Sequence, residues 1–190
     1  MMTPSHLLLN WAILGNKNET ITERSTILFG ALMPDVAVWI FSLWFFSTIG
    51  MQFGDIWESY YWTPSINVWF NLAHSLVLLP SIAICGYLFK RRLVFLFGMS
   101  ATMHALCDFF LHADDAYTNF LPFTDWRFVS PVSYWDPAHY GTIFAPVESC
   151  IVIIAIFYLY KRVTTRHAKV LLILTAALVA GAGVAHVFAL

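Results

Sequence analysis

The sequence predicts an all-α polytopic membrane protein, a helix bundle of about five transmembrane helices with an N-terminal half-helix. Three observations predict this fold class: 59% of the 190 residues are hydrophobic, only 11% are charged, and several apolar stretches match the thickness of a bilayer. A soluble domain averages about 25% charged residues, and a spanning helix needs about 20 mostly apolar ones. We therefore expect one integral membrane domain over residues 1–190. The net charge of −1, without a long basic stretch, gives no sign of nucleic-acid binding.

Five apolar stretches are the predicted spans: residues 26–49, 66–89, 93–113, 144–160 and 168–189. The loops between them are of two kinds. Two are short and basic, around Lys90–Arg92 and over residues 161–169. The other two, about 50–65 and 114–143, are longer, rich in Trp and Tyr, and nearly free of Lys and Arg. The positive-inside rule puts the basic loops in the cytoplasm and the aromatic loops on the periplasmic side of a bacterial inner membrane.

A short helix is expected before the first span. Thr3 as N-cap and Pro4 as first helical residue predict a helix over residues 4–15 that ends at Gly15. Because this helix is too short to cross the bilayer, two interpretations stay open. It is either a half-helix that re-enters the membrane, or an amphipathic helix that lies on the membrane surface.

Ionisable residues are rare inside membrane spans and usually mark a functional site. Here they are His6, Asp35, His74, His104, Asp108 and His112. A rise of 1.5 Å per residue places Asp35 about 13 Å from the cytoplasmic end of its span, and His74 and His104 about 12–13 Å from their outer ends. His6 reaches a similar level if its helix points inward. The shared depth predicts a single site.

Spacing supports this prediction within the third span. Steps of four residues place His104, Asp108 and His112 on one stripe of a helix. Imidazoles and carboxylates together are the ligand set of zinc or another divalent first-row metal. The simpler alternative for His104 and Asp108 is an internal salt bridge. The roles of Asp114, Asp115, Asp136 and Glu148 stay open.

The motifs follow one another in a recognisable order. They are TPSH (3–6), MPD (33–35), AHS (73–75), HALCD (104–108), HADD (112–115) and PF (122–123). This order resembles that of the YdjM-like family of inner-membrane proteins, described as metal-dependent hydrolases, over roughly residues 3–123. The chain departs from the family at Ala37, where a further acidic residue is usual, and it lacks the His-Arg pair before His74.

A more distant resemblance is to bacterial zinc-dependent phospholipase C and related single-strand nucleases. The ligand order of their zinc site implies as metal ligands His6, Asp35, His74, His104, Asp108, His112 and His139. It implies two or three zinc ions, or another divalent metal, and hydrolysis of a phosphoester, with Asp35 as ligand and general base. Arg127, the only basic residue of the outer loops, is either a phosphate clamp or a headgroup-level anchor. The expected substrate is a lipid or lipid-linked phosphoester on the periplasmic side.

Two other functions compete with this interpretation. Intramembrane His and Asp residues also form translocation paths, so a transporter or metal-ion permease is the main alternative. No inverted repeat of the kind common in transporters is evident in the sequence. Ligation of haem by paired histidines is a second alternative, but it leaves Asp35 and Asp108 unexplained.

Overall fold

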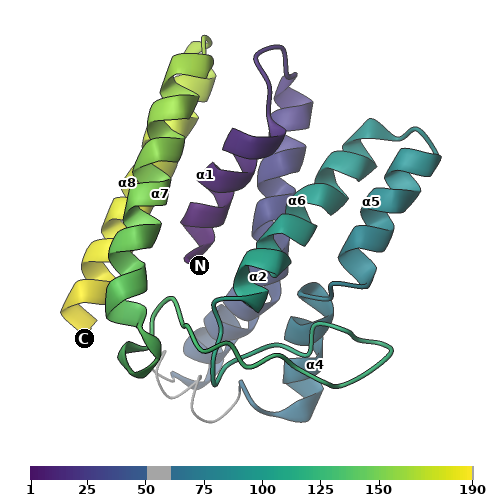
Figure 1. Ribbon diagram of the computed structural model, residues 1–190, viewed down its shortest axis with the longest axis vertical. Coiled ribbons are helices and arrows are strands. Elements are labelled where there is room, and N and C mark those ends of the chain that lie inside the picture. The colour runs from purple at the N-terminus through teal and green to yellow at the C-terminus, as the bar shows by residue number, and fades with distance from the viewer. Residues whose placement is uncertain (51–60, 190) are drawn as a thin grey trace.

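The computed structural model describes residues 1–50 and 61–189, with side chains up to residue 179. Within these ranges all regular structure is helical, which confirms the predicted all-α class (Figure 1). The helices are α1 (Thr3–Leu14), α2 (Ile21–Ile49), α4 (Pro64–Ala73), α5 (Leu78–Leu88), α6 (Arg92–Phe109), α7 (Gly141–Arg162) and α8 (Arg166–Ala189), with a short 3₁₀ turn, η1 (Pro137–His139). The aromatic segment at residues 57–62 lies mostly outside the described residues.

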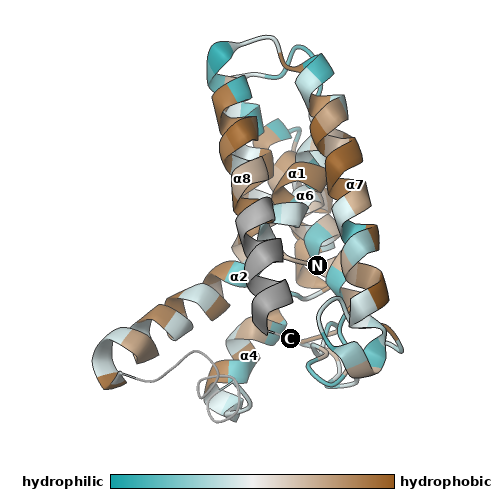
Figure 2. Cartoon of the chain, turned by 90° about the vertical axis from the view of Figure 1, so that its left-hand side faces the viewer, coloured by the Kyte–Doolittle hydropathy of each residue, from teal (hydrophilic) through white to brown (hydrophobic). Residues whose placement is uncertain are grey.

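Three helical stretches are long and apolar enough to cross a membrane: Ile21–Ile49, Pro64–Leu88 and Gly141–Arg162. Bulky apolar side chains are exposed along them, as expected for lipid-facing helices, and Figure 2 shows apolar residues running along α7. The predicted total of about five spans is not confirmed. The third expected span, α6, ends at Phe109 rather than residue 113 and mixes polar residues into its sequence. The last, α8, has side chains described only in part.

Helix α1 lies inside the bundle. It packs against α2 and α6 on one side and against α7 and α8 on the other, and its N-terminus lies near the middle of the molecule (Figure 1). Leu8 and Trp11 are fully buried in an apolar cluster shared with α2, α6, α7 and α8. Of the two interpretations left open above, this packing favours the half-helix over the surface helix.

The predicted N-cap of α1 is wrong in one respect. The helix begins at Thr3, with Met2 as the N-cap residue and no side-chain cap. The Thr3 hydroxyl donates instead to Asp35 Oδ2 on α2, at 2.5 Å. The start of a helix offers only N–H donors, whereas the Asp35 carboxylate accepts the hydroxyl hydrogen in a charge-assisted bond, and the hydroxyl thereby joins α1 to α2 beside the candidate site.

Buried Arg162, at the end of α7, holds the other end of α1. Its guanidinium donates to the carbonyl oxygens of Trp11, Ala12 and Gly15, at 2.7–3.0 Å. These carbonyls belong to the last turn of α1 and the residue after it, where most carbonyls lack a helical partner, although that of Trp11 also accepts from the Gly15 amide. An arginine from a neighbouring helix thus replaces the water that would satisfy them at a surface.

The second candidate span is broken between α4 and α5. Residues 74–77 are non-helical, and their polar groups find partners within the protein: Ser75 Oγ accepts from the amides of Val77 and Leu78, and Asn119 donates to the His74 carbonyl. Irregular backbone inside a membrane is tolerated when it is buried in protein. The break places His74 at the end of α4 instead of inside a continuous helix.

The connections of the bundle lie at two ends. The α1–α2, α5–α6 and α7–α8 connections share one end, and the long α6–α7 loop (residues 110–136) lies at the other (Figure 1). The first group carries the basic residues of the predicted cytoplasmic loops. The α6–α7 loop is the described part of the predicted aromatic side.

Candidate metal centre

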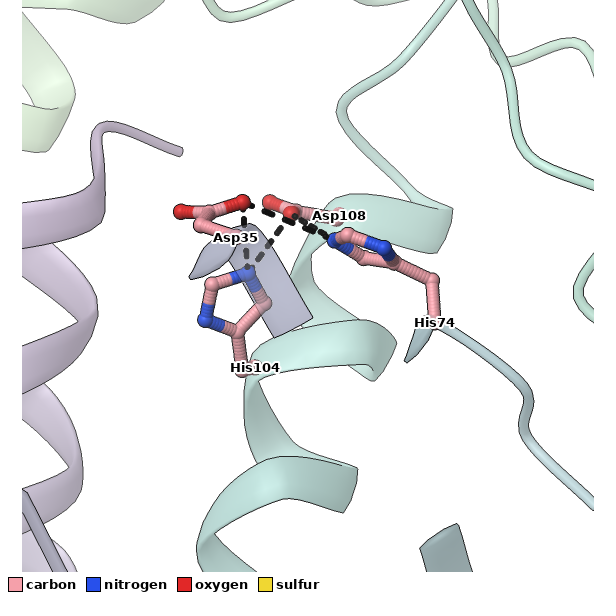
Figure 3. Close-up of side chains that lie close together, drawn as sticks. All are labelled: Asp35, His74, His104 and Asp108. Atoms are coloured by element: carbon pink, nitrogen blue, oxygen red, sulfur yellow. Dashed lines mark ion pairs between the residues drawn. The ribbon is translucent and has the colours of Figure 1, made fainter. Parts of the chain in front are cut away.

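Four of the predicted ligands meet where α2, α6 and the α4–α5 break come together. Asp35 comes from α2, His74 from the break, and His104 and Asp108 from successive turns of α6 (Figure 3). Each offers one ligand atom, and these four atoms lie within 4.8 Å of one another. His74, His104 and Asp108 are buried, and the Asp35 side chain is 14% exposed.

Backbone carbonyls fix the orientation of both imidazoles. His104 Nδ1 lies 2.6 Å from the Ala31 carbonyl oxygen, and His74 Nδ1 lies 2.9 Å from that of Phe70. Because a carbonyl only accepts, Nδ1 carries the hydrogen in each ring, and Nε2 of the neutral ring is left with a free lone pair. This is the arrangement that supports histidine ligands in metal sites.

The free ring nitrogens face carboxylate oxygens. His104 Nε2 lies 3.1 Å from Asp108 Oδ2 and 3.4 Å from Asp35 Oδ1. His74 Nε2 lies 3.5 Å and 3.6 Å from the same two oxygens. Both Nε2 atoms are buried without a hydrogen-bond partner. In the neutral rings, four electron-rich atoms therefore point at one another, and a cation between them removes the repulsion. The group could hold a metal ion.

The second oxygen of Asp108 faces α1. Asp108 Oδ1 lies 2.7 Å from the Met1 amine and 3.0 Å from His6 Nε2. The His6 ring stacks on His104, with ring centroids 3.7 Å apart. The neighbouring Met2 amide donates to Glu148 Oε1 on α7, whose Oε2 is buried without a partner. Asp108 thus lies between two groups of polar side chains, one on either side of its carboxylate.

The α6–α7 loop contributes His112 on the outer side of Asp108. His112 Nε2 lies 3.8 Å from Asp108 Oδ2, and its Nδ1 lies 2.8 Å from Asp115 Oδ2. Trp135 Nε1 also donates to this oxygen, at 3.0 Å. Burial raises the pKa of Asp115, but the hydrogen bonds from His112 and Trp135 outweigh it and hold the pKa below its usual range. An ionised Asp115 orients the His112 ring as the two carbonyls orient the others.

His139 is placed apart from this cluster. It forms a second group with Asp114 and Asp136 in the loop region, where the ligand atoms also lie within 4.8 Å of one another. The hydrogen bond between His139 Nδ1 and Asp136 Oδ2, at 2.6 Å, raises the pKa of His139 and lowers that of Asp136. Asp114, the third member of this group, is exposed.

Arg127 also has its contact in the loop region. Its guanidinium lies over the Trp62 ring, 5.9 Å from the ring centroid. An arginine stacked on a tryptophan is typical of the headgroup-level anchor considered above. The phosphate-clamp role stays a prediction.

Several residues around the site were not assigned from the sequence. Thr3 binds Asp35, Asp115 orients His112, and the Tyr117 ring stacks on His74 with centroids 3.8 Å apart. The spacing of three residues between His112 and Asp115 was the available signal for one of them. No such signal exists for Thr3 or Tyr117, whose contacts depend on the packing of separate segments.

In comparisons with known proteins, no family model, no curated protein and no solved structure matches the chain.

Proposed function

We propose that this protein is a membrane-embedded, metal-dependent hydrolase, with zinc as the metal, that cleaves a phosphoester of a lipid or lipid-linked substrate at the outer face of a bacterial inner membrane. One observation carries the proposal. The Nε2 atoms of His74 and His104 are buried, unpartnered and aimed at Asp35 and Asp108, while their Nδ1 atoms are fixed by backbone carbonyls. A histidine with Nδ1 hydrogen-bonded to a carbonyl and Nε2 unpartnered is expected of a metal ligand. In an ordinary apolar core, a buried ring nitrogen would instead have a hydrogen-bond partner.

The donor set fits zinc. Two imidazoles and two carboxylates suit zinc and similar divalent ions, and the buried location excludes the many waters that magnesium retains. Asp35, His74, His104 and Asp108 would hold one ion. His6, His112 and Glu148 surround them and supply ligands for a second or third. When bound, a divalent ion activates water as a nucleophile near neutral pH and stabilises charge on phosphate oxygens.

Asp35 is the residue best placed to move a proton. Its Oδ2 accepts the Thr3 hydroxyl hydrogen, and Oδ1 faces the two imidazoles. The hydrogen bond from Thr3 fixes the carboxylate, so Oδ1 keeps one orientation toward the reacting centre. Its 14% exposed side chain is also the most accessible of the four, as a general base in contact with substrate must be.

The location of the site supports a substrate at the outer face. Asp108 is the penultimate residue of α6, and Glu148 lies about 10 Å along α7 from its start, at the end of the bundle opposite the basic connections. By the positive-inside rule, that end faces the periplasm. The resemblance to the YdjM-like family and to zinc-dependent phospholipase C in ligand order supports phosphoester hydrolysis.

Metal content and activity of single variants test the proposal. We expect purified wild-type protein to contain zinc by elemental analysis and to hydrolyse a phosphoester, and His104→Ala and Asp108→Ala to lose both. His167→Ala, which changes an exposed histidine, is the control and should behave as the wild type. Zinc retained in full by both site variants contradicts the metal centre. Zinc bound in the wild type without hydrolysis, together with ion flux into liposomes, favours the transporter.

A further inference from the structure

We propose that the Tyr134 hydroxyl donates a hydrogen bond to a phosphoryl oxygen of the substrate at the metal centre. The inference rests on the proposed function and adds to it a residue that contacts the substrate. Tyr134 belongs to the α6–α7 loop and directly precedes Trp135, which binds Asp115. The phenol keeps its proton throughout, so it acts as a donor to the phosphoryl group and takes no part in proton transfer.

Tyr134 is placed beside the centre by its ring and by its backbone. The ring lies against that of His112, with ring centroids 5.2 Å apart. The Tyr134 amide donates to the Leu111 carbonyl, at 3.1 Å. The side chain is half-buried, whereas that of Tyr117, which stacks on His74, is buried. Tyr134 therefore borders the centre and is still in part accessible from outside the protein.

The Tyr134 hydroxyl lies among the carboxylates of the site. Burial raises the pKa of this phenol well above its ordinary value, and four negative charges raise the pKa further, in the order Asp108, Asp115, Asp35 and Glu148. These carboxylates come from α6, the α6–α7 loop, α2 and α7. A hydroxyl that is affected by all four lies in the region that they surround. At neutral pH it is protonated and can donate a hydrogen bond.

Two other side-chain donors near the centre already have acceptors. The Thr3 hydroxyl donates to Asp35, and Trp135 Nε1 donates to Asp115. By contrast, the described part of the chain contains no hydrogen-bond partner for the Tyr134 hydroxyl. A donor beside a metal site that is not engaged by the protein is available to a ligand.

The loop holds Tyr134 in place before a ligand binds. Ser133 Oγ accepts from the amides of Trp135 and Asp136, at 3.3 and 3.2 Å. The Ser133 amide donates to the His139 carbonyl, at 2.8 Å. These hydrogen bonds fix both neighbours of Tyr134 in the sequence. A donor that is oriented in advance needs little reorganisation when charge develops on the substrate.

A phosphoryl group at this centre needs such a donor. Bound metal ions neutralise part of the charge on its oxygens, but the surrounding carboxylates repel them. Arg127, the only basic residue of the α6–α7 loop, lies over the Trp62 ring. A phenol donates to an anionic oxygen without adding charge, and a hydrogen bond to an ionised acceptor is about twice as strong as one between neutral groups. Tyr134 therefore stabilises oxygen charge that the metal leaves uncompensated.

Binding of inorganic phosphate to the full chain, loaded with manganese in detergent, tests this contact without depending on catalysis. Paramagnetic enhancement of ³¹P relaxation reports phosphate at the metal. We expect Tyr134→Phe, which removes only the hydroxyl, to weaken phosphate binding about tenfold, equivalent to about 1.4 kcal/mol. The manganese content should not change. In the zinc-loaded protein, the same variant should lower kcat/KM for a phosphoester at least about tenfold.

The matched control is Tyr140→Phe, which removes the same hydroxyl from an exposed tyrosine further along the chain. It should bind phosphate as the wild type does. Equal phosphate affinities of the two variants overturn the inference. Loss of manganese from Tyr134→Phe also overturns it, because the hydroxyl would then support the metal site and not the phosphate.

The same measurements separate this inference from the proposed function. Weaker phosphate binding in Tyr134→Phe, together with a wild type that hydrolyses no phosphoester, rejects the proposed function and leaves the phosphate contact standing. Hydrolysis by the wild type, together with unchanged phosphate affinity in Tyr134→Phe, supports the proposed function and rejects the contact.

Discussion

At the scale of single residues, the centre depends on which nitrogen of each imidazole is free. The rings of His104 and His74 are oriented by hydrogen bonds to the carbonyls of Ala31 and Phe70. The ring of His112 is oriented by the carboxylate of Asp115. Each partner keeps the hydrogen on Nδ1 and turns Nε2 toward Asp108. A carboxylate partner also raises the basicity of the ring, and its removal typically weakens metal binding about 10–100-fold.

Asp115 is the one partner that mutation can change, because the other two are backbone groups. We expect Asp115→Asn to weaken zinc affinity about tenfold, since the amide keeps the shape of the side chain but loses its charge. Competition with a chromophoric chelator measures the affinity. Asp125→Asn, the same change at an exposed position of the same loop, is the control. Equal affinities of the two variants would show that His112 does not bind the metal.

The metal-ligating residues of the centre could be predicted from the sequence, but the groups that orient their side chains could not. The four-residue spacing of His104 and Asp108 defines one helical face, so their proximity followed from helix geometry. The prediction that His112 continues this stripe is wrong, because α6 ends at Phe109 and His112 reaches Asp108 from the loop. The acceptors at Ala31 and Phe70 carry no such signal, because every residue has a carbonyl. His139 was assigned from the ligand order of zinc-dependent phospholipase C, but it lies with Asp114 and Asp136, apart from the other ligands. The order of residues along the chain does not determine the path of a long loop.

At the scale of helices, α1 positions His6 and Thr3 by being held at both ends. Arg162 binds the carbonyls at one end, and Thr3 binds Asp35 at the other. The length of this helix was predictable from Thr3, Pro4 and Gly15. Its burial was not, because most of its residues are apolar and the sequence gives no polar face to distinguish a core from a surface position.

Loss of Arg162 should loosen α1 and with it the centre. We expect Arg162→Ala to lower the free energy of unfolding by about 3 kcal/mol, because it leaves one buried and two part-buried carbonyls without their charged donor. Unfolding of the detergent-solubilised protein, followed by circular dichroism, measures the change. Arg166→Ala removes an exposed arginine four residues away and should have little effect. A loss of stability no larger than that of the control would mean that α1 does not need this cap.

The break between α4 and α5 shows what hydropathy alone misses. Residues 66–89 are apolar enough to be taken for one continuous span, but the helix stops at Ala73 and restarts at Leu78. Pro80 was the residue in the sequence that indicated the break. Proline is tolerated in the first turn of a helix but not in its interior, so Pro80 predicts a helix start near residue 78. Ser75 lies within the break, but the other partners that make it tolerable come from a distant part of the chain: Asn119 donates to the His74 carbonyl, and the Leu121 carbonyl accepts from Ser75.

At the scale of the whole molecule, the metal centre brings together side chains from segments that are far apart in the sequence. Its ligands come from α2, the α4–α5 break and α6, with His6 from α1 and Glu148 from α7 nearby. Without a cation, Asp35 and Asp108 are two acidic groups in a region that excludes water, and charges in such a region are costly unless paired. A metal ion that binds only the folded chain therefore stabilises the entire bundle.

Metal removal should accordingly lower the thermal stability of the protein. Free zinc at 100 times its dissociation constant adds about 2.7 kcal/mol to the free energy of unfolding. We expect the midpoint of thermal unfolding to fall after chelation and to return when zinc is added back, and His104→Ala to show neither change. Because protons compete with zinc for imidazole, whose ordinary pKa is about 6.5, the gain from zinc should shrink as the pH falls from 7.5 to 5.5. A gain that is independent of pH, or is kept in His104→Ala, would place the stabilising zinc at another site.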